Sequence, residues 1–303
     1  MDSGYPAFLA RIFEVQDRVA SLHPCLEHLY PVAVAEGNEL AVYDVNSSGR
    51  RYDFVARVRV PMTLPDKIRA AFPLEDFGGR MACVVTGDAF STIEGYVEIF
   101  HEFVHCYQFE QCENDLKQTL GVATKARAEN DYMWEINYPF PYEDPRVCQE
   151  YSSLLELLES ADPWLPRNSA LGSQKSADYE EVSRCRKALR DTLDGYAFEY
   201  MVWQEWKEGF ARYIENRIRN RLGLPLNLGG RIPPFSRVSF YAGGAALIGF
   251  LADSQPEVVR DLRHLFSRLM EIGAADSGAV SASGLRRGQI LGEGSGLYVP
   301  TGM

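Results

Sequence analysis

Apolar side chains in the first part of the chain recur with two different periods, and each period predicts a different element. From Phe8 to Leu22 they recur every three or four positions, which is typical of an amphipathic helix. Between residues 32 and 60 the apolar residues fall into short segments, and the segment Arg51 to Val60 alternates apolar and polar side chains. Alternation with a period of two predicts a half-buried strand, with Val55 as the exception on its polar face.

Strands are therefore predicted at Val32–Ala35, Glu39–Val45 and Arg51–Val60. The turn residues Asn46 to Gly49 predict that the second and third strands form a hairpin. On the third strand we expect Tyr52, Phe54, Ala56, Val58 and Val60 to share one face. A further short strand is predicted at Met81–Thr86.

After Thr86 the pattern becomes helical. Ser91 followed by Glu94 forms a capping box and predicts a helix from there to about Cys112. Further helices are predicted at Cys148–Ala161, from Tyr179 to about Leu222 with a break at Gly195, and after a second capping box made by Ser254 and Glu257.

These elements predict an α+β fold, with a β-rich N-terminal region packed on a mainly helical remainder. We expect a helix and hairpin region at residues 1–65, a larger domain at 66–273 with a helical insert at 113–200, and a loosely held Gly/Ser-rich tail at 274–303. The boundary near residue 65 is soft, because the two parts can share one core.

The net charge of the chain is −11, from 31 basic and 42 acidic residues. An acidic chain repels phosphate backbones, which argues against nucleic acid as a partner. The N-terminus lacks the cationic start and apolar run of a secretory signal, and the longest apolar stretch, Phe240 to Ala252, is shorter than the ~20 residues that span a bilayer. We therefore expect a cytoplasmic protein that does not enter membranes. The sequence carries no indication of its oligomeric state.

The segment HEFVH, residues 101 to 105, is the sharpest chemical signal in the chain. His101 and His105 lie four positions apart inside a predicted helix, so both imidazoles lie on one face and can reach one metal ion. Glu102 follows the first histidine, where a carboxylate can accept a proton from metal-bound water. The pattern predicts a zinc site with Glu102 as general base.

A catalytic zinc ion takes three protein ligands and keeps one position open, so a third ligand is required. In the metzincin pattern it is a histidine soon after the second one, but the positions that this pattern specifies hold Gln108 and Gln111. The cysteine segment that completes the HExxH site of peptide deformylases does not precede His101. A carboxylate from another helix is therefore expected, and residues 203–217 offer Glu205, Glu208 and Glu215.

The segment Glu208-Gly209-Phe210-Ala211 resembles the EGFA segment of gluzincin metallopeptidases, in which the glutamate is the third zinc ligand. The resemblance favours Glu208 over Glu205 and Glu215. Gly209 adds physical support, because its missing side chain permits another helix to approach closely. Glu215 lies about two turns beyond Glu208 and is a candidate partner for the second ring nitrogen of a ligand histidine.

A later segment, with Tyr241, Gly244, Leu247 and Leu251, is similar to the YxxGxxLxxxL stretch of the same family. The family tyrosine donates a hydrogen bond to the tetrahedral oxyanion, which makes Tyr241 a candidate for that role. The alternative is a core aromatic residue at a helix start. The order of the five site residues along the chain, from His101 to Tyr241, matches the family order.

Two departures limit the resemblance. The spacer between His105 and Glu208 is far longer than in gluzincin aminopeptidases, so the insert must fold as a helical subdomain beside the site. The GxMEN motif, whose glutamate anchors a free amino terminus, is absent, so trimming of N-termini is not supported.

The resemblance implies a zincin-like domain that holds Zn²⁺ and hydrolyses peptide bonds in a peptide or protein substrate. In zincins a strand before the first histidine often pairs with the substrate backbone as an edge strand, and Met81–Thr86 is the expected strand here. Two alternatives remain open: a retired peptidase scaffold that acts as a binding protein, and a metal hydrolase of a non-peptide amide or ester. The intact Glu102 argues against the first, and a metal other than zinc is compatible with these ligands.

Overall fold

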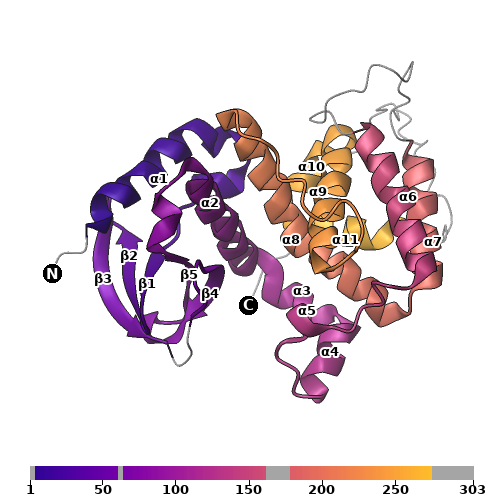
Figure 1. The fold of residues 1–303 in the computed structure, drawn as a ribbon, viewed down its shortest axis with the longest axis horizontal. Coiled ribbons are helices and arrows are strands. Elements are labelled where there is room, and N and C mark those ends of the chain that lie inside the picture. The colour runs from indigo at the N-terminus through magenta and orange to yellow at the C-terminus, as the bar shows by residue number, and fades with distance from the viewer. Residues whose placement is uncertain (1–3, 61–63, 162–177, 275–303) are drawn as a thin grey trace, which may run out of the picture.

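The computed structural model describes residues 4–60, 64–161 and 178–274. In Figure 1 the strands, α1 and α2 lie on one side, and the remaining helices lie on the other. The helices of the described residues are α1 (Tyr5–Val19), α2 (Ile93–Gln108), α3 (Asn114–Thr119), α4 (Gly121–Ala128), α5 (Trp134–Asn137), α6 (Pro145–Ala161), α7 (Tyr179–Thr192), α8 (Gly195–Leu222), α9 (Arg237–Ser254), α10 (Pro256–Arg260) and α11 (Leu262–Glu271). The strands are β1 (Val32–Glu36), β2 (Glu39–Val45), β3 (Tyr52–Arg59), β4 (Arg69–Leu74) and β5 (Arg80–Thr86).

These strands form one sheet in the order β3-β2-β1-β5-β4. β1 pairs with β5 in parallel, and the other neighbours pair antiparallel. The mixed sheet and the separate group of helices confirm the predicted α+β class. Strands from both sides of residue 65 belong to this sheet, so the hairpin region and the chain that follows it are joined by backbone hydrogen bonds.

The edge strand β4 escaped prediction, because its sequence contains alanines and Pro73 and no β-branched residue. Proline is tolerated in an edge strand, where its missing N–H costs no ladder hydrogen bond. β5 confirms the strand predicted at Met81–Thr86, but it lies between β1 and β4. The expectation that Met81–Thr86 forms the free edge is therefore wrong, and β4 takes that place.

The predicted hairpin of β2 and β3 is confirmed, but the expectation that Tyr52, Phe54, Ala56 and Val58 share one face of β3 is wrong. Val42 pairs with Ala56 whereas the next residue, Tyr43, pairs with Phe54, so Val55 is an extra residue in β3. Such a bulge reverses the alternation of faces. Tyr52 consequently packs with the helices, whereas Val58 packs on the opposite face of the sheet.

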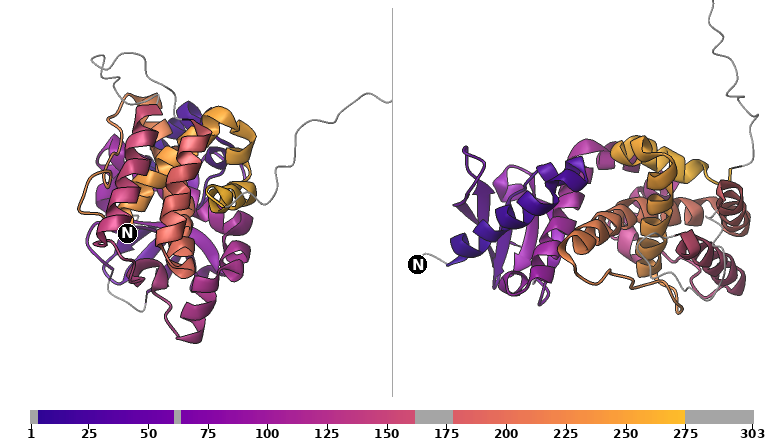
Figure 2. Two further views of the ribbon diagram at one scale, coloured as in Figure 1. Left: turned by 90° about the vertical axis from the view of Figure 1, so that its right-hand side faces the viewer. Right: turned by 90° about the horizontal axis from the view of Figure 1, so that it is seen from above.

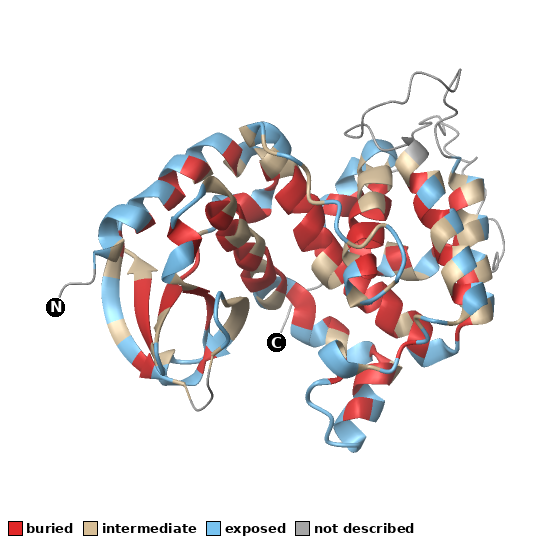
Figure 3. Cartoon of the chain, viewed as in Figure 1, coloured by how far each residue is buried: buried red, intermediate tan, exposed pale blue. Residues whose placement is uncertain are grey.

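α1 and α2 cover one face of the sheet, and their inward side chains form the main core with it (Figures 1 and 3). Leu9 of α1 and Phe100 of α2 are fully buried there with Val34 of β1. α2 is thereby held firmly against β4 and β5, and this contact positions the HEFVH segment.

α8 is the central helix of the second half and contacts α2, α9 and α11 (Figures 1 and 2). The predicted break before it is confirmed: α7 ends at Thr192, and Asp194 caps α8 by accepting a hydrogen bond from the backbone N–H of Ala197. Trp203 and Trp206 of α8 are completely buried, so this helix also carries much of the core.

α8 and α9 cross at two glycines. A Cβ atom on Gly209 would lie 2.7 Å from Cα of Gly244, and one on Gly244 would lie 2.4 Å from the carbonyl oxygen of Glu205. These distances are too short for any side chain, so glycine is required on both helices. The close approach expected at Gly209 is confirmed, and it brings α9 against the turn of α8 that carries Glu208.

Two helix starts differ from the predicted capping boxes. Thr92, and not Ser91, caps α2 by accepting a hydrogen bond from the N–H of Gly95. Ser254 is the last residue of α9, and its hydroxyl donates to the carbonyl of Phe250. Each serine is held by the turn that precedes it and cannot begin the next helix.

Among the described residues, no helix is long and apolar enough to cross a membrane. The predicted insert at 113–200 contains α3 to α7 and the start of α8, and its residues 162–177 lie outside the described part. The predicted tail also lies outside it from residue 275 onward.

Candidate metal centre

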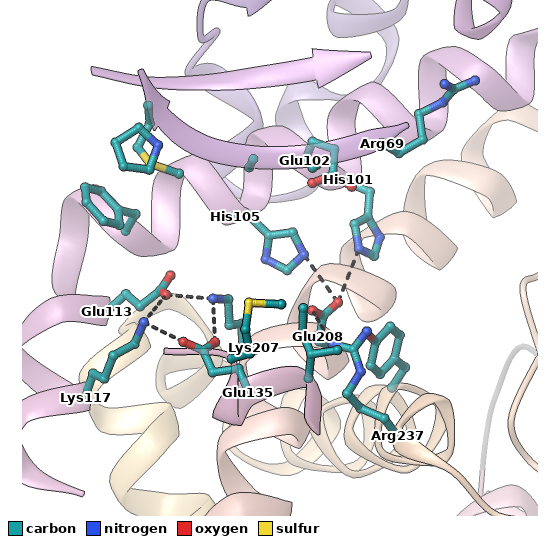
Figure 4. A pocket seen from close by; sticks show the side chains of 18 of the residues that line it. Arg69, His101, Glu102, His105, Glu113, Lys117, Glu135, Lys207, Glu208 and Arg237 are labelled. Carbon is teal, nitrogen blue, oxygen red and sulfur yellow. Dashed lines mark hydrogen bonds and ion pairs between the residues drawn. The ribbon is translucent and has the colours of Figure 1, made fainter. Parts of the chain in front are cut away.

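Three helices that are far apart in the sequence bring the predicted site residues into one pocket. α2 contributes His101, Glu102 and His105, α8 contributes Glu208, and α9 contributes Tyr241. All of them line a pocket of about 550 Å³ between the β4 edge and the helical half (Figure 4). The structure therefore assembles every residue that the sequence predicted for the site.

The donor atoms of His101, His105 and Glu208 converge (Figure 4). Oε2 of Glu208 lies 3.4 Å from Nε2 of His105 and 3.9 Å from Nε2 of His101. All three ligand atoms lie within 4.8 Å of one another. Donors around a tetrahedral zinc ion at ~2.0–2.1 Å are ~3.4 Å apart, so these three side chains fit a metal ion with small movements.

Each imidazole is oriented through its other ring nitrogen. Nδ1 of His101 donates to Oε2 of Glu215 at 3.1 Å, and Nδ1 of His105 donates to Oε1 of Gln108 at 3.0 Å. A hydrogen on Nδ1 leaves the lone pair on Nε2, which is the atom that faces Glu208. The suggestion that Glu215 accepts a hydrogen bond from a histidine of the HEFVH segment is confirmed for His101.

Gln108 was considered in the sequence only as one of two positions that depart from the metzincin pattern. Its amide nitrogen donates to the carbonyls of Trp206 and Lys207, at 3.1 Å each. Because these carbonyls only accept, the amide oxygen of Gln108 must face His105. Gln108 therefore links the helix of the histidines to the turn before Glu208 and sets the tautomer of His105.

The electrostatic surroundings favour a cation between these side chains. Burial lowers the pKa of His101, but Glu208 and Glu215 outweigh it and raise that pKa to about 10. Burial raises the pKa of Glu208, but His105 and His101 outweigh it and hold that pKa well below its usual range. A carboxylate that stays ionised beside two imidazoles suits a proton or a metal ion equally.

The two rival glutamates of α8 have other partners. Glu205 is completely buried and accepts two hydrogen bonds from Arg186, at 2.8 and 2.9 Å. Glu215 faces His101 from the side away from Glu208 and also pairs with Arg219, at 2.7 Å. Among the three candidates Glu208 alone joins the two histidines in a group that could hold a metal ion.

Glu102 lies in the same pocket, next to the histidines. Burial raises the pKa of its carboxyl group, while His105 and His101 partly oppose the rise. Within the described part of the chain, its carboxylate makes no hydrogen bond or ion pair, and only charge interactions act on it. A buried, unpaired carboxylate with a raised pKa is suited to accept and return a proton.

Tyr241 and Arg237 form the α9 side of the pocket. Burial and the Glu208 carboxylate both raise the pKa of Tyr241, so the phenol keeps its proton and can donate a hydrogen bond. Nη1 of Arg237 lies 3.8 Å from Oε1 of Glu208, and its guanidinium lies 5.5 Å from the ring centre of Tyr241. Arg237 was not predicted, although it precedes Tyr241 by one helical turn, and this spacing could have indicated it.

On the other side of His105 lies a charged quartet, Glu113, Lys117, Glu135 and Lys207 (Figure 4). Lys207 contacts Glu113 at 2.7 Å and Glu135 at 2.9 Å, and Lys117 contacts Glu135 at 2.6 Å and Glu113 at 3.3 Å. Two acidic and two basic side chains balance each other. The quartet therefore adds no net charge to the pocket.

The β4 edge forms the wall opposite the helical half. Ala70, Ala71 and Pro73 line the pocket from this strand. Arg69 at its start pairs with Asp88 and Glu98, which fastens the strand to the segment before α2 and to α2 itself. A free strand edge beside the candidate metal ligands can pair with an extended peptide.

Comparisons of the chain with protein-family models, with curated proteins and with solved structures found no match. The case for a function therefore rests on the geometry of this pocket.

Proposed function

We propose that this protein is a zinc-dependent hydrolase of peptide bonds, with a catalytic site of the gluzincin type. One observation carries the proposal: His101 and His105, each oriented through Nδ1, face Glu208, and the unpaired Glu102 lies beside them in an open pocket. A purely structural metal site takes four protein ligands and has no use for a free carboxylate.

Zinc held by His101, His105 and Glu208 would supply a water molecule of lowered pKa and polarise the scissile carbonyl. Glu102 takes a proton from the attacking water as its oxygen bonds to the carbonyl carbon. Glu102 then delivers this proton to the amine nitrogen as the C–N bond breaks. Tyr241 and Arg237 donate hydrogen bonds to the carbonyl oxygen, where negative charge develops.

The β4 edge supports a peptide over a non-peptide amide or ester. An extended peptide gains backbone hydrogen bonds along a strand edge, and the small side chains of Ala70 and Ala71 leave room for it. A small ester makes no use of such an edge. Zinc is supported by the ligand set of two imidazoles and one carboxylate, although this set also suits other divalent transition metals.

The test begins with metal content. Protein purified without added metal or chelator is compared with Glu208→Ala and Glu102→Gln, each analysed for bound zinc and then for cleavage of a mixed peptide library. We expect about one zinc per chain in the wild type and in Glu102→Gln, and a sharp loss in Glu208→Ala. Cleavage should fall by about 100-fold or more in Glu102→Gln, because the general base is lost while the metal stays.

Other outcomes distinguish the alternatives. Full zinc in Glu208→Ala would remove Glu208 from the ligand set. Bound zinc without cleavage of any peptide, but with turnover of amide or ester substrates, would establish the non-peptide hydrolase. Zinc without any turnover would favour the retired scaffold, and a wild type that binds no offered metal would refute the metal site.

A further inference from the structure

Three large apolar side chains are exposed within a few residues of each other at the mouth of the pocket. Tyr132, Met133 and Ile136 are 80%, 51% and 53% exposed, and all three line the pocket that contains the metal ligands. Large apolar side chains that gather on a surface usually mark a binding site, because exposing them to water is unfavourable. We call these residues the apolar lip.

The segment that carries the lip is held in place. Trp134 is buried, with its ring 6.2 Å from that of Trp203. The backbone carbonyl of Glu135 accepts hydrogen bonds from Gln204 at 2.8 Å and from Tyr200 at 3.2 Å. The exposure of the lip is therefore built into the fold, since its neighbours in sequence are fixed to α8.

The charged quartet strengthens this anchor and shapes the chemistry of the lip. The Glu135 carboxylate is held by Lys117 at 2.6 Å and by Lys207 at 2.9 Å, and Lys207 also contacts Glu113 at 2.7 Å. Each charge beneath the lip already has partners of opposite sign. A charged substrate side chain therefore gains no free partner there, whereas an apolar side chain gains contact with the lip.

We infer that the apolar lip is a specificity subsite that binds a large apolar side chain of the peptide whose backbone lies along β4. The inference rests on the proposed function and deepens it, since it names the substrate class: peptides with a leucine-sized or aromatic residue beside the scissile bond. The continuity of the lip with the metal pocket supports this occupant over a separate protein partner. Burial of such a side chain favours it over alanine by roughly 10- to 100-fold in kcat/KM.

The test uses two matched sets of probes on the full, zinc-loaded chain. The first is a pair of peptides that differ only by leucine or alanine at the residue beside the bond cleaved in the library. The second is a pair of peptide hydroxamates with an isobutyl or a methyl side chain, whose affinity is measured by calorimetry. Hydroxamates bind through the metal, so the second set reports on the lip even without turnover.

The double variant Met133→Ser with Ile136→Ser is compared with Ile232→Ser, which removes an apolar side chain that is 78% exposed and does not line the pocket. We expect the leucine-over-alanine and isobutyl-over-methyl ratios to fall about tenfold in the double variant and to stay unchanged in Ile232→Ser. Equal affinity of the wild type for both hydroxamates, or an unchanged ratio in the double variant, would overturn the subsite. A retained isobutyl preference without any peptide cleavage would refute the proposed function but keep the subsite. If neither hydroxamate binds, the subsite falls together with the metal site.

Discussion

Lys207 and Glu208 are neighbours on α8, yet they belong to two charged groups of different kinds. In one group the charges pair with one another, and in the other the donor atoms converge on one position. Lys207 joins Glu113, Lys117 and Glu135, where each charge contacts charges of opposite sign within 3.3 Å or less. Glu208 joins His101 and His105, whose lone-pair donors all face one point. The charges of the first group pair with one another, whereas the three donors of the second converge on a position that a cation can fill, with Arg237 at 3.8 Å from the other oxygen of Glu208.

The difference teaches how a functional charge can be told from a structural one in the same pocket. A buried charge that finds an opposite charge inside the protein stabilises the fold or joins its parts, as Glu205 does with Arg186. A set of donors without an internal cation of matching geometry is poised for a ligand. Both kinds occur within about one turn of α8, at Glu205, Lys207 and Glu208.

The largest expected effect is on zinc affinity, which should depend on Glu208 and not on the charged quartet. Glu208→Gln replaces the ligand carboxylate with a neutral amide and should lower zinc affinity by roughly 100-fold or more. Glu135→Gln makes the same change in the same pocket and should leave zinc affinity nearly unchanged. The measurement is competition with a chromophoric zinc chelator. Equal losses in both variants would show that the charge of the whole pocket, and not the convergent donors, holds the ion.

The next effect tests the helix crossing that brings α9 to the site. Gly244→Ala places a Cβ 2.4 Å from the Glu205 carbonyl oxygen, so α8 and α9 must separate, and we expect a loss of about 3 kcal/mol in the free energy of unfolding. Gly249→Ala on the same helix is the control, because its Cβ would meet only Tyr213, at 3.9 Å, and alanine favours helix by up to ~1 kcal/mol. Chemical denaturation checks both. Similar stability of the two variants would contradict the close crossing.

The third effect concerns the pH dependence of the charged quartet. Burial would raise the pKa of Glu135, but Lys207 and Lys117 outweigh it and lower that pKa from 4.5 to about 2. A lowered folded-state pKa stabilises the fold above the unfolded pKa, and this contribution is lost as pH falls through the folded value. Glu135→Gln should therefore cost about 2 kcal/mol at pH 7, and the difference from wild type should shrink between pH 4.5 and 2. A difference that stays constant over this range would exclude the ionised carboxylate as its cause.

The smallest effect concerns the orientation of His101. Glu215→Gln weakens the hydrogen bond from Nδ1, so zinc affinity should fall by about tenfold, less than for Glu208→Gln. Arg219→Gln is the matched control, because it removes the 2.7 Å contact between Arg219 and Glu215 without touching His101. Zinc competition measures both variants. If Arg219→Gln weakens zinc binding as much as Glu215→Gln does, the effect comes from the surroundings of Glu215 and not from the imidazole.

Much of the local structure followed from the sequence, and the elements that were not predicted share a common cause. The amphipathic start, the hairpin and the helix of HEFVH were predicted because they depend on neighbours within a few residues. The bulge at Val55, the edge strand β4, the cap at Thr92 and the start of α10 at Pro256 were missed. Each of these depends on which segment packs against which, and propensity is a weak guide there.

By itself the sequence determined that His101, Glu102 and His105 lie together, because helix geometry places positions i and i+4 on one face. It also limited the third ligand to the glutamates of one helix. The EGFA resemblance favoured Glu208 among them, but only the tertiary structure supplied the distances that separate the three. Glu205 pairs with Arg186, Glu215 accepts a hydrogen bond from Nδ1 of His101, and Glu208 faces both Nε2 atoms next to the glycine crossing. The physical reason is that a ligand set is a matter of a few ångströms between distant segments, and such distances are fixed only when the core packs.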